Sequence, residues 1–158
     1  MLIAKNTEGK LVSALETSLQ RKEPYSCPGC QGVVLLRHGQ VMCPHFAHKS
    51  LQDCQFFSEN ESVQHLSLKA ALYKSLVNHG EKVSIEKVLS EMGQIADLFV
   101  GDSLALEVQC SRLSQQRLRE RTCAYHQAGY EVRWLLGEEL WLNGRFNRPT
   151  AGLSLFYG

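Results

Sequence analysis

The stretch 94–110, which reads QIADLFVGDSLALEVQC, constrains the fold of this chain more than any other. Two short apolar runs, 95–100 and 104–108, flank a Gly-Asp-Ser segment of the kind that makes tight turns. Apolar runs of this length on either side of a turn predict a β-hairpin. The second half of the chain is therefore expected to be organised around a pair of adjacent strands.

Polar side chains interrupt this hairpin. Asp97 lies in the first run and Glu107 in the second, and Gln109 projects to the same side as Glu107 because side chains alternate along a strand. A carboxylate in an apolar strand is costly to desolvate unless it is paired. Two carboxylates on adjacent strands repel each other unless a cation lies between them, so the pattern predicts a divalent-metal site. The alternative is that Asp97 lies at the rim of the turn and Glu107 faces water from an edge strand.

Length and composition limit the class of protein. A chain of 158 residues holds one ordinary domain and a small module. A net charge of +1 excludes a global basic surface for nucleic acid, so any such surface must be local. No apolar run is long enough to span a membrane and the N-terminus lacks a secretory signal, so we expect a cytoplasmic protein. Thiols stay reduced there, so the six cysteines favour metal binding or free thiols over disulfides.

The cysteines and histidines of the N-terminal third predict a structural zinc site. Cys27 and Cys30 form a Cys-x2-Cys pair that presents two thiolates to one ion. His45 and His48 follow about fifteen residues later and complete a tetrahedral set in our preferred assignment. Four protein ligands leave no open position for catalysis. A hairpin of 33–36 and 40–42 is expected to bring the two halves of the site together.

Other ligand choices stay open at this point. Cys43 is the main rival of His45, Cys54 is a weaker rival, and His38 is a further candidate. The alternative to any zinc site is a set of reduced cysteines buried in a small core.

Helical periodicity replaces the strand pattern between 60 and 79 and predicts an amphipathic helix. Glu61 and His65 lie one turn apart on this helix and share a face, with Lys69 next along. The alternative role of Glu61 is that of a favourable partner of the helix dipole in the first turn. Lys69 is expected to be a solvated surface residue.

A second helix, expected at 111–128 with Ser114 as its N-cap, carries several arginines. Arg117 and Arg121 are spaced i, i+4 and share a face, so they are our candidates for contacts to DNA phosphates. Such contacts bind DNA with little sequence preference. The alternative is a solvated face paired with Glu120.

The remaining patterns complete the order of elements. The segment 81–88 alternates as a strand, and 130–137 has the composition of another. A further hairpin is expected at the N-terminus, from 2–4 and 11–14. The second half therefore reads helix, three strands, helix, strand.

This αβββαβ order, with an acidic residue on each hairpin strand, resembles the core of the PD-(D/E)xK nuclease superfamily. There, an Asp and a Glu at the positions of Asp97 and Glu107 bind Mg²⁺, and a Glu on the first helix, at the position of Glu61, joins them. A Lys two residues after the Glu helps orient the attacking water, and Gln109 stands at that position. The resemblance implies an α/β (α+β mixed) fold in which these four residues form the catalytic set.

Seven motifs in a fixed order carry a more specific resemblance. They are CPGC, PHFAHKS, ESVQHLSLKAAL, IADLFV, ALEVQCS, LRERT and EVRWLLG. Over nearly all of the chain, they resemble the competence protein CoiA family. The resemblance implies a β-rich, zinc-ribbon-like module at 1–58 and a nuclease-like domain at 59–158. Members are usually longer, with a helical region after the core that we expect this chain to lack.

The family is associated with natural transformation and with the processing or recombination of incoming DNA. The resemblance therefore implies a metal-dependent deoxyribonuclease with Mg²⁺ or Mn²⁺ on Asp97 and Glu107, and with a structural Zn²⁺. DNA and recombination proteins are the implied partners, and DNA would be contacted by His65, Arg117 and Arg121.

Gln109 leaves the activity open, because an amide cannot supply the positive charge of a lysine. Either Lys69 or an arginine of the second helix substitutes, or the site is slow, or the protein is an inactive, DNA-binding recombination accessory factor that keeps the nuclease fold. A third class, a zinc-ribbon adaptor for protein interactions, fits only the N-terminal third of the chain.

Overall fold

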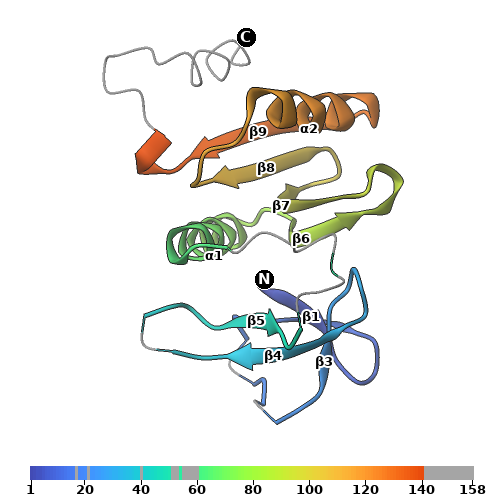
Figure 1. Cartoon of the computed structure of the whole chain (residues 1–158), viewed down its shortest axis with the longest axis vertical. Helices are drawn as coiled ribbons and strands as arrows, with labels where there is room; N and C mark the ends of the chain where they lie inside the picture. Colours follow the sequence, from blue (N-terminus) through green and yellow to red (C-terminus); the bar gives the residue numbers. More distant parts are fainter. Residues whose placement is uncertain (17, 21, 40, 51–53, 55–60, 141–158) are drawn as a thin grey trace.

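The computed structural model describes all residues except 17, 21, 40, 51–53, 55–60 and 141–158. The chain forms two β-sheets, and Figure 1 shows the N-terminal sheet below the sheet that carries both helices. A β-rich region followed by an αβββαβ core confirms the predicted fold class. Within the part of the chain that the structure describes, no helix is long and apolar enough to cross a membrane.

The N-terminal sheet has the strand order β2-β1-β3-β4-β5, and every neighbouring pair is antiparallel. The expected N-terminal hairpin is confirmed as β1 and β2. The bounds of the strands are β1 (Ile3–Lys5), β2 (Leu11–Ser13), β3 (Tyr25–Ser26), β4 (Val33–Arg37) and β5 (His45–His48).

The predicted hairpin of 33–36 and 40–42 is wrong in its second strand. β4 pairs with β5 itself, with Leu36 opposite Phe46, whereas the described residues 41 and 42 belong to no strand. The reason is burial, because this register places Phe46, which is 1% exposed, against Tyr25 at a ring-centroid distance of 5.0 Å. The histidines of the HFAH motif therefore lie on a strand, where successive side chains point to opposite faces.

The second sheet has the order β6-β7-β8-β9, antiparallel except for the parallel pair β8–β9. Helix α2 connects this parallel pair, which requires a long crossover. The bounds are α1 (Val63–Asn78), β6 (Val83–Leu89), β7 (Gln94–Val100), β8 (Leu104–Gln109), α2 (Gln115–Gln127) and β9 (Glu131–Leu136), with short 3-10 helices at Ser90–Met92 and Glu138–Leu140. The expected elements of this half are confirmed, although Asn60, the expected start of the first helix, lies outside the described residues.

Both helices begin at serine caps. The Ser114 hydroxyl accepts a hydrogen bond from the backbone N–H of Arg117 at 3.2 Å, as the sequence predicts. The Ser62 hydroxyl accepts one from the backbone N–H of His65 at 3.1 Å. Each cap satisfies a backbone donor that the helix leaves unpaired, and both first turns line the same cavity.

Strand β1 joins the two parts of the chain. Leu2 and Ile3, 0% and 8% exposed, pack in one apolar cluster with Leu66 of α1 and Leu98 of β7. The backbone N–H groups of Leu2 and Ile3 donate to the carboxylate of Glu86 on β6, at 2.7 and 2.9 Å. The N-terminal sheet is therefore bound to the second part by both apolar and charged contacts.

Strands β7 and β8 separate at the predicted carboxylates. Their ladder ends at the pair Leu98–Leu106, next to Asp97 and Glu107. Beyond that pair, the backbone N–H of Val108 donates to the Asp97 carboxylate at 2.8 Å instead of to a strand carbonyl. This separation opens a cavity between the strands and the helices.

Candidate active site and metal centre

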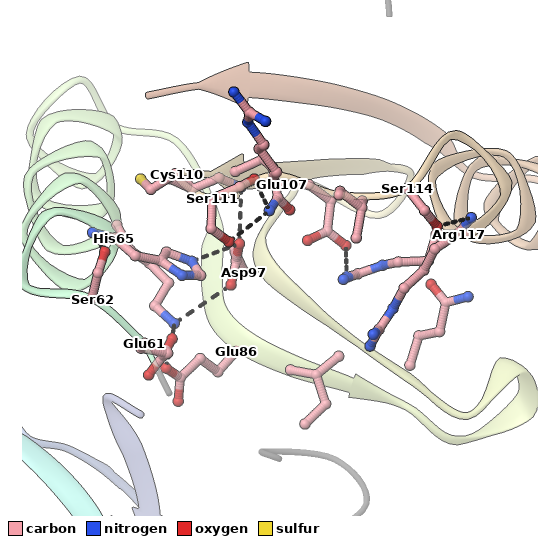
Figure 2. A pocket seen from close by; sticks show the side chains of 18 of the residues that line it. Glu61, Ser62, His65, Glu86, Asp97, Glu107, Cys110, Ser111, Ser114 and Arg117 are labelled. Carbon is pink, nitrogen blue, oxygen red and sulfur yellow. Dashed lines mark hydrogen bonds and ion pairs between the residues drawn. The ribbon is translucent and has the colours of Figure 1, made fainter. Parts of the chain in front are cut away.

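A cavity of about 820 Å³ opens where β7 and β8 separate (Figure 2). Its walls come from α1, β6, β7, β8 and the first turns of α2. All residues that the sequence nominates for catalysis or for DNA contact line this cavity: Glu61, His65, Asp97, Glu107, Gln109, Arg117 and Arg121. The structure thus gathers residues that are as far as 60 positions apart in the sequence.

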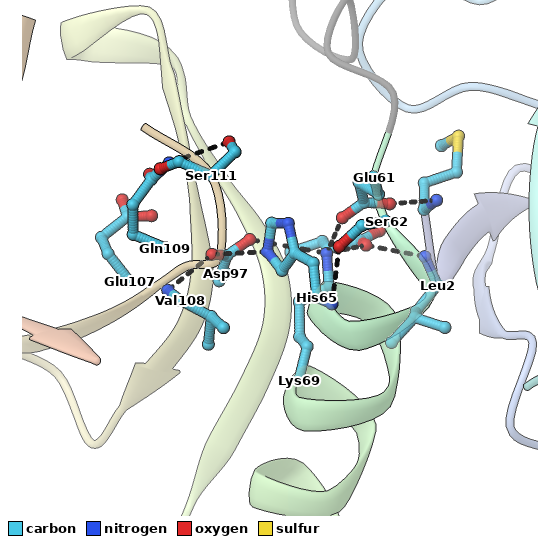
Figure 3. Close-up of polar contacts among 12 residues, drawn as sticks. Leu2, Glu61, Ser62, His65, Lys69, Asp97, Glu107, Val108, Gln109 and Ser111 are labelled. Atoms are coloured by element: carbon cyan, nitrogen blue, oxygen red, sulfur yellow. Dashed lines mark hydrogen bonds and ion pairs between the residues drawn. The ribbon is translucent and has the colours of Figure 1, made fainter. Parts of the chain in front are cut away.

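Asp97 lies at the centre of one group of side chains. Its Oδ2 contacts Nε2 of His65 at 3.1 Å, and its Oδ1 lies 3.4 Å from the Lys69 ammonium (Figure 3). Burial alone would raise the pKa of Asp97, but the Lys69 charge and the His65 hydrogen bond outweigh it and hold that pKa well below its usual range. Asp97 is therefore ionised at neutral pH and able to bind a cation.

Glu61, His65 and Asp97 form a candidate divalent-metal site. One ligand atom from each lies within 4.8 Å of the others. Glu61 is also paired with the Lys69 ammonium and with the α-amino group of Met1, and these charges lower its pKa against the effect of burial. Two carboxylates and an imidazole are a chemically suitable donor set for Mn²⁺ or a similar ion.

Lys69 is buried, which corrects the expectation of a solvated surface residue. Its side chain is 1% exposed, and its ammonium pairs with Glu61, with Glu86 at 2.7 Å and with Asp97 at 3.4 Å. Burial alone would lower the pKa of Lys69, but the three carboxylates outweigh it and raise that pKa. Lys69 is thus a permanent positive charge beside the candidate metal site.

Glu107 faces a different set of partners from Asp97. Its Oε1 accepts hydrogen bonds from Arg121, at 2.8 Å, and from the hydroxyl of Tyr125, both on α2. Its side chain is 3% exposed, and burial raises its pKa to about 7 although Arg121 opposes this shift. Glu107 lines the cavity but does not belong to the group of Glu61, His65 and Asp97.

The two arginines of α2 that the sequence nominates for DNA contact have different environments. Arg121 is 24% exposed, pairs with Glu107 and lies 5.4 Å from the ring centroid of Trp134. Arg117 is exposed at the N-terminal end of α2 and lines the cavity. Glu120, the expected alternative partner, accepts a hydrogen bond from Gln116 at 2.8 Å. Arg117 is consequently better placed than Arg121 to reach a phosphate group.

Gln109 lies at the outer part of the cavity. Its side-chain amide donates to the backbone carbonyl of Ser111 at 2.7 Å. An amide held in this way carries no charge, so the positive charge nearest to Asp97 comes from Lys69 on α1 and not from β8.

A second metal-binding group lies in the N-terminal sheet. Sγ atoms of Cys27, Cys30 and Cys54 and a ring nitrogen of His48 lie within 4.8 Å of one another. The Cys30 Sγ is 3.4 Å from Nε2 of His48, and the Sγ atoms of Cys27 and Cys54 are 3.9 Å apart. A Cys3His set of this size can bind a metal such as zinc in tetrahedral geometry.

His45 does not join this group, and Cys54 takes the place that the sequence assigns to it. His48 shares a sheet face with the buried Phe46, whereas His45 lies on the other face because side chains alternate along β5. A ring nitrogen of His45 is instead 2.9 Å from the carbonyl oxygen of Cys43. Cys43, the main rival candidate, packs against the apolar cluster between the two sheets.

Two residues at the site escape the sequence analysis, namely Glu86 and Tyr125. Both are buried, and each binds a residue from another element, Lys69 and Glu107 respectively. The alternating pattern of 81–88 gives no sign that Glu86 turns toward α1. Tyr125 gives no signal either, because its position on the predicted second helix is that of an ordinary apolar residue.

The chain matches two family models of known proteins. Residues 61–148 match the family model of the nuclease-like domain of competence protein CoiA, and residues 10–57 match that of its N-terminal domain. Because the nuclease-like match covers more than half of the 158 residues, the chain belongs to the CoiA family, which confirms the resemblance seen in the motifs.

A curated relative extends this comparison. The chain is 28% identical over 150 residues to competence protein CoiA of Bacillus subtilis (strain 168), covering 93% of this chain and 38% of that protein. The chain thus spans well under half the length of this relative. No solved structure matches the chain.

The buried charges predict a pH-dependent loss of stability in Lys69→Met. Lys69 lowers the pKa of Asp97 and Glu61, so it contributes stability above their unfolded values of about 4 that is lost as pH falls. Without it, the carboxylates repel one another, and the variant loses stability as pH rises. We expect a deficit of about 3–5 kcal/mol near pH 8 and a smaller one near pH 4, where protonation relieves the repulsion in the variant, measured by urea unfolding.

Lys82→Met is the matched control, because Lys82 is exposed and pairs with the exposed Asp102. Its effect should stay below about 1 kcal/mol at both pH values. An equal deficit for Lys69→Met at both pH values would contradict the assignment of its role to charge.

The Cys3His group predicts about one tightly bound zinc per chain in protein purified without chelators. Cys54→Ala should lower the zinc content severely and reduce folding, because metal binding is coupled to folding. His45→Ala and the exposed Cys123→Ala should both retain zinc. Elemental analysis decides the assignment, and loss of zinc from His45→Ala with retention in Cys54→Ala would reverse it.

Proposed function

We propose that this chain is a metal-dependent, nuclease-like unit that acts on DNA during natural transformation. The observation that carries the proposal is the convergence of Glu61, His65 and Asp97 within 4.8 Å beside the Lys69 ammonium, on the wall of one cavity. Acidic ligands and an adjacent positive charge are what phosphodiester hydrolysis requires. Membership of the CoiA family and the name of the Bacillus subtilis relative support a role in competence.

In this proposal Asp97, Glu61 and His65 hold Mg²⁺ or Mn²⁺, and Glu107 supplies a further carboxylate to the same cavity. The ion, when bound, lowers the pKa of a water and neutralises charge in the transition state. Asp97 is suited to this role because its low pKa keeps it ionised. Gln109, at the position of the superfamily lysine, orients water or phosphate only through hydrogen bonds.

Lys69 supplies the positive charge that Gln109 lacks. Because its side chain is 1% exposed, it acts by holding Glu61 and Asp97 in place and does not touch DNA. Contact with DNA falls to the exposed Arg117 at the mouth of the cavity. His65, also predicted to contact DNA, is only 21% exposed and is assigned to the ion in this proposal. Phosphate contacts of this kind fix DNA without reading its sequence.

One observation favours a second candidate, a DNA-binding accessory factor that has lost cleavage. Four of the carboxylates that line the cavity already pair with a cation of the chain: Glu61, Glu86 and Asp97 with Lys69, and Glu107 with Arg121. In that case the ammonium of Lys69 replaces the metal, and the fold serves to bind DNA alone.

Divalent-dependent cleavage distinguishes the two candidates. Wild type should cut linear or branched DNA with Mg²⁺ or Mn²⁺, and Asp97→Asn should lower the rate by about 10² or more, because a ligand charge is lost. Asp102→Asn, at an exposed turn carboxylate, is the matched control and should keep the wild-type rate. Gln109→Lys should preserve or increase cleavage. Binding without any cleavage by wild type would support the accessory factor.

The position of Arg117 predicts its contribution to DNA binding. Arg117→Glu should weaken binding to unrelated sequences alike and flatten the dependence of log Kd on log salt by about one unit. Arg119→Glu reverses the charge of an exposed arginine on the same helix that does not line the cavity, so its slope should change less. Fluorescence anisotropy over a salt series measures both. Equal slopes in the two variants would place the DNA elsewhere.

A further inference from the structure

Glu86 is a buried carboxylate that the proposed chemistry does not use. It is 3% exposed, and both of its oxygens are occupied. Oε1 accepts from the backbone N–H of Leu2 and from Lys69, each at 2.7 Å, and Oε2 accepts from the N–H of Ile3 at 2.9 Å. Because both oxygens already accept hydrogen bonds, Glu86 is poorly suited to bind a metal. It is suited instead to hold the amides of β1 and the ammonium of Lys69.

The backbone at Glu86 is unusual for a strand. Its φ of +50° lies in the left-handed region, which is unfavourable for a side chain of this kind. Ile85 and Leu98 are paired across β6 and β7 and pack toward α1, so regular alternation would turn Glu86 and Asp97 to the opposite face. Both carboxylates nevertheless contact Lys69 of α1. The ladder has no pair at Glu86 and Asp97, and this interruption is where the two side chains turn toward the helix.

The Lys69 ammonium is shared unequally among the carboxylates. It lies 2.7 Å from Glu86 but 3.4 Å from Asp97, at the limit of a hydrogen bond. Asp97 Oδ1 is therefore the least strongly engaged of the oxygens around Lys69. It belongs to the residue that lies at the centre of the candidate metal site.

We propose that Glu86 is a positioning residue: anchored by the backbone of β1, it draws Lys69 away from Asp97 and leaves Asp97 Oδ1 accessible to a divalent cation. The role assigned to the cation rests on the proposed function. Because the amides of Leu2 and Ile3 hold Glu86, the N-terminal module becomes part of the acidic site. This arrangement depends on the left-handed backbone of Glu86.

Charge counting makes the proposal testable. Three carboxylates and one ammonium leave two net negative charges on Glu61, Lys69, Glu86 and Asp97. Glu86→Gln removes one of them and frees Lys69 to approach Asp97.

The test is Mn²⁺ binding to the full chain, measured by calorimetry without DNA. Glu86→Gln should weaken Mn²⁺ binding about tenfold or more. Glu86→Asp keeps the charge, tolerates the left-handed backbone and lengthens the contact to Lys69, so it should weaken binding by a smaller factor. The exposed Glu81→Gln, just before β6, is the control and should match wild type. Mn²⁺ binding by Glu86→Gln as tight as that of wild type would overturn the proposal.

Crystal structures of wild type and Glu86→Gln give a readout that needs no metal. The distance from Lys69 Nζ to Asp97 Oδ1 should shorten from 3.4 Å to below about 3.0 Å. An unchanged distance would overturn the positioning role of Glu86. A shortened distance in a protein whose wild type binds no Mn²⁺ would support that role and refute the metal-dependent function instead.

Discussion

The ammonium of Lys69, buried among Glu61, Glu86 and Asp97, is the interaction on which the rest of the structure depends. It fixes α1 against β6 and β7 and lowers the pKa of both Glu61 and Asp97, which favours their ionised forms. A buried charge whose partner is removed costs about 3–5 kcal/mol, which is a large part of the stability of a domain of this size. The network is thus both a structural support and the electrostatic setting of the cavity.

The same network connects the two candidate metal centres. His48 of the Cys3His group lies on β5, and Phe46 on that strand donates its N–H to the carbonyl of Met1 at 2.8 Å. The next residues, Leu2 and Ile3, donate to Glu86 and so reach Lys69. The module that carries the Cys3His group therefore holds Glu86, one of the carboxylates of the acidic site, through backbone hydrogen bonds. A positive charge can reach the cavity from α1, through Lys69, and not only from β8. An uncharged residue at position 109 is therefore compatible with the nuclease fold.

The sequence by itself determined the elements and their order. Strand and helix periods, the turn at 101–103 and the Ser114 cap act over a few residues, so they predict the αβββαβ core with nearly correct bounds. The sequence also nominated the catalytic and DNA-contact candidates that line the cavity, although not Glu86, because carboxylates inside apolar strands and arginines one turn apart are local signals. The CPGC motif likewise indicated a metal centre from its spacing alone.

Only the tertiary structure decided which of these residues act together. Pairing β4 with β5 placed His45 on the face away from Cys27 and brought in Cys54, because burial of Phe46 selects the strand register. Packing of α1 on the sheet buried Lys69, whose helical position alone is equally compatible with solvent. The left-handed backbone of Glu86 reversed the alternation of side chains along β6. A periodic sequence pattern cannot predict such a reversal. Contacts between distant segments depend on the total burial of many side chains, and a local sequence pattern does not reveal that total.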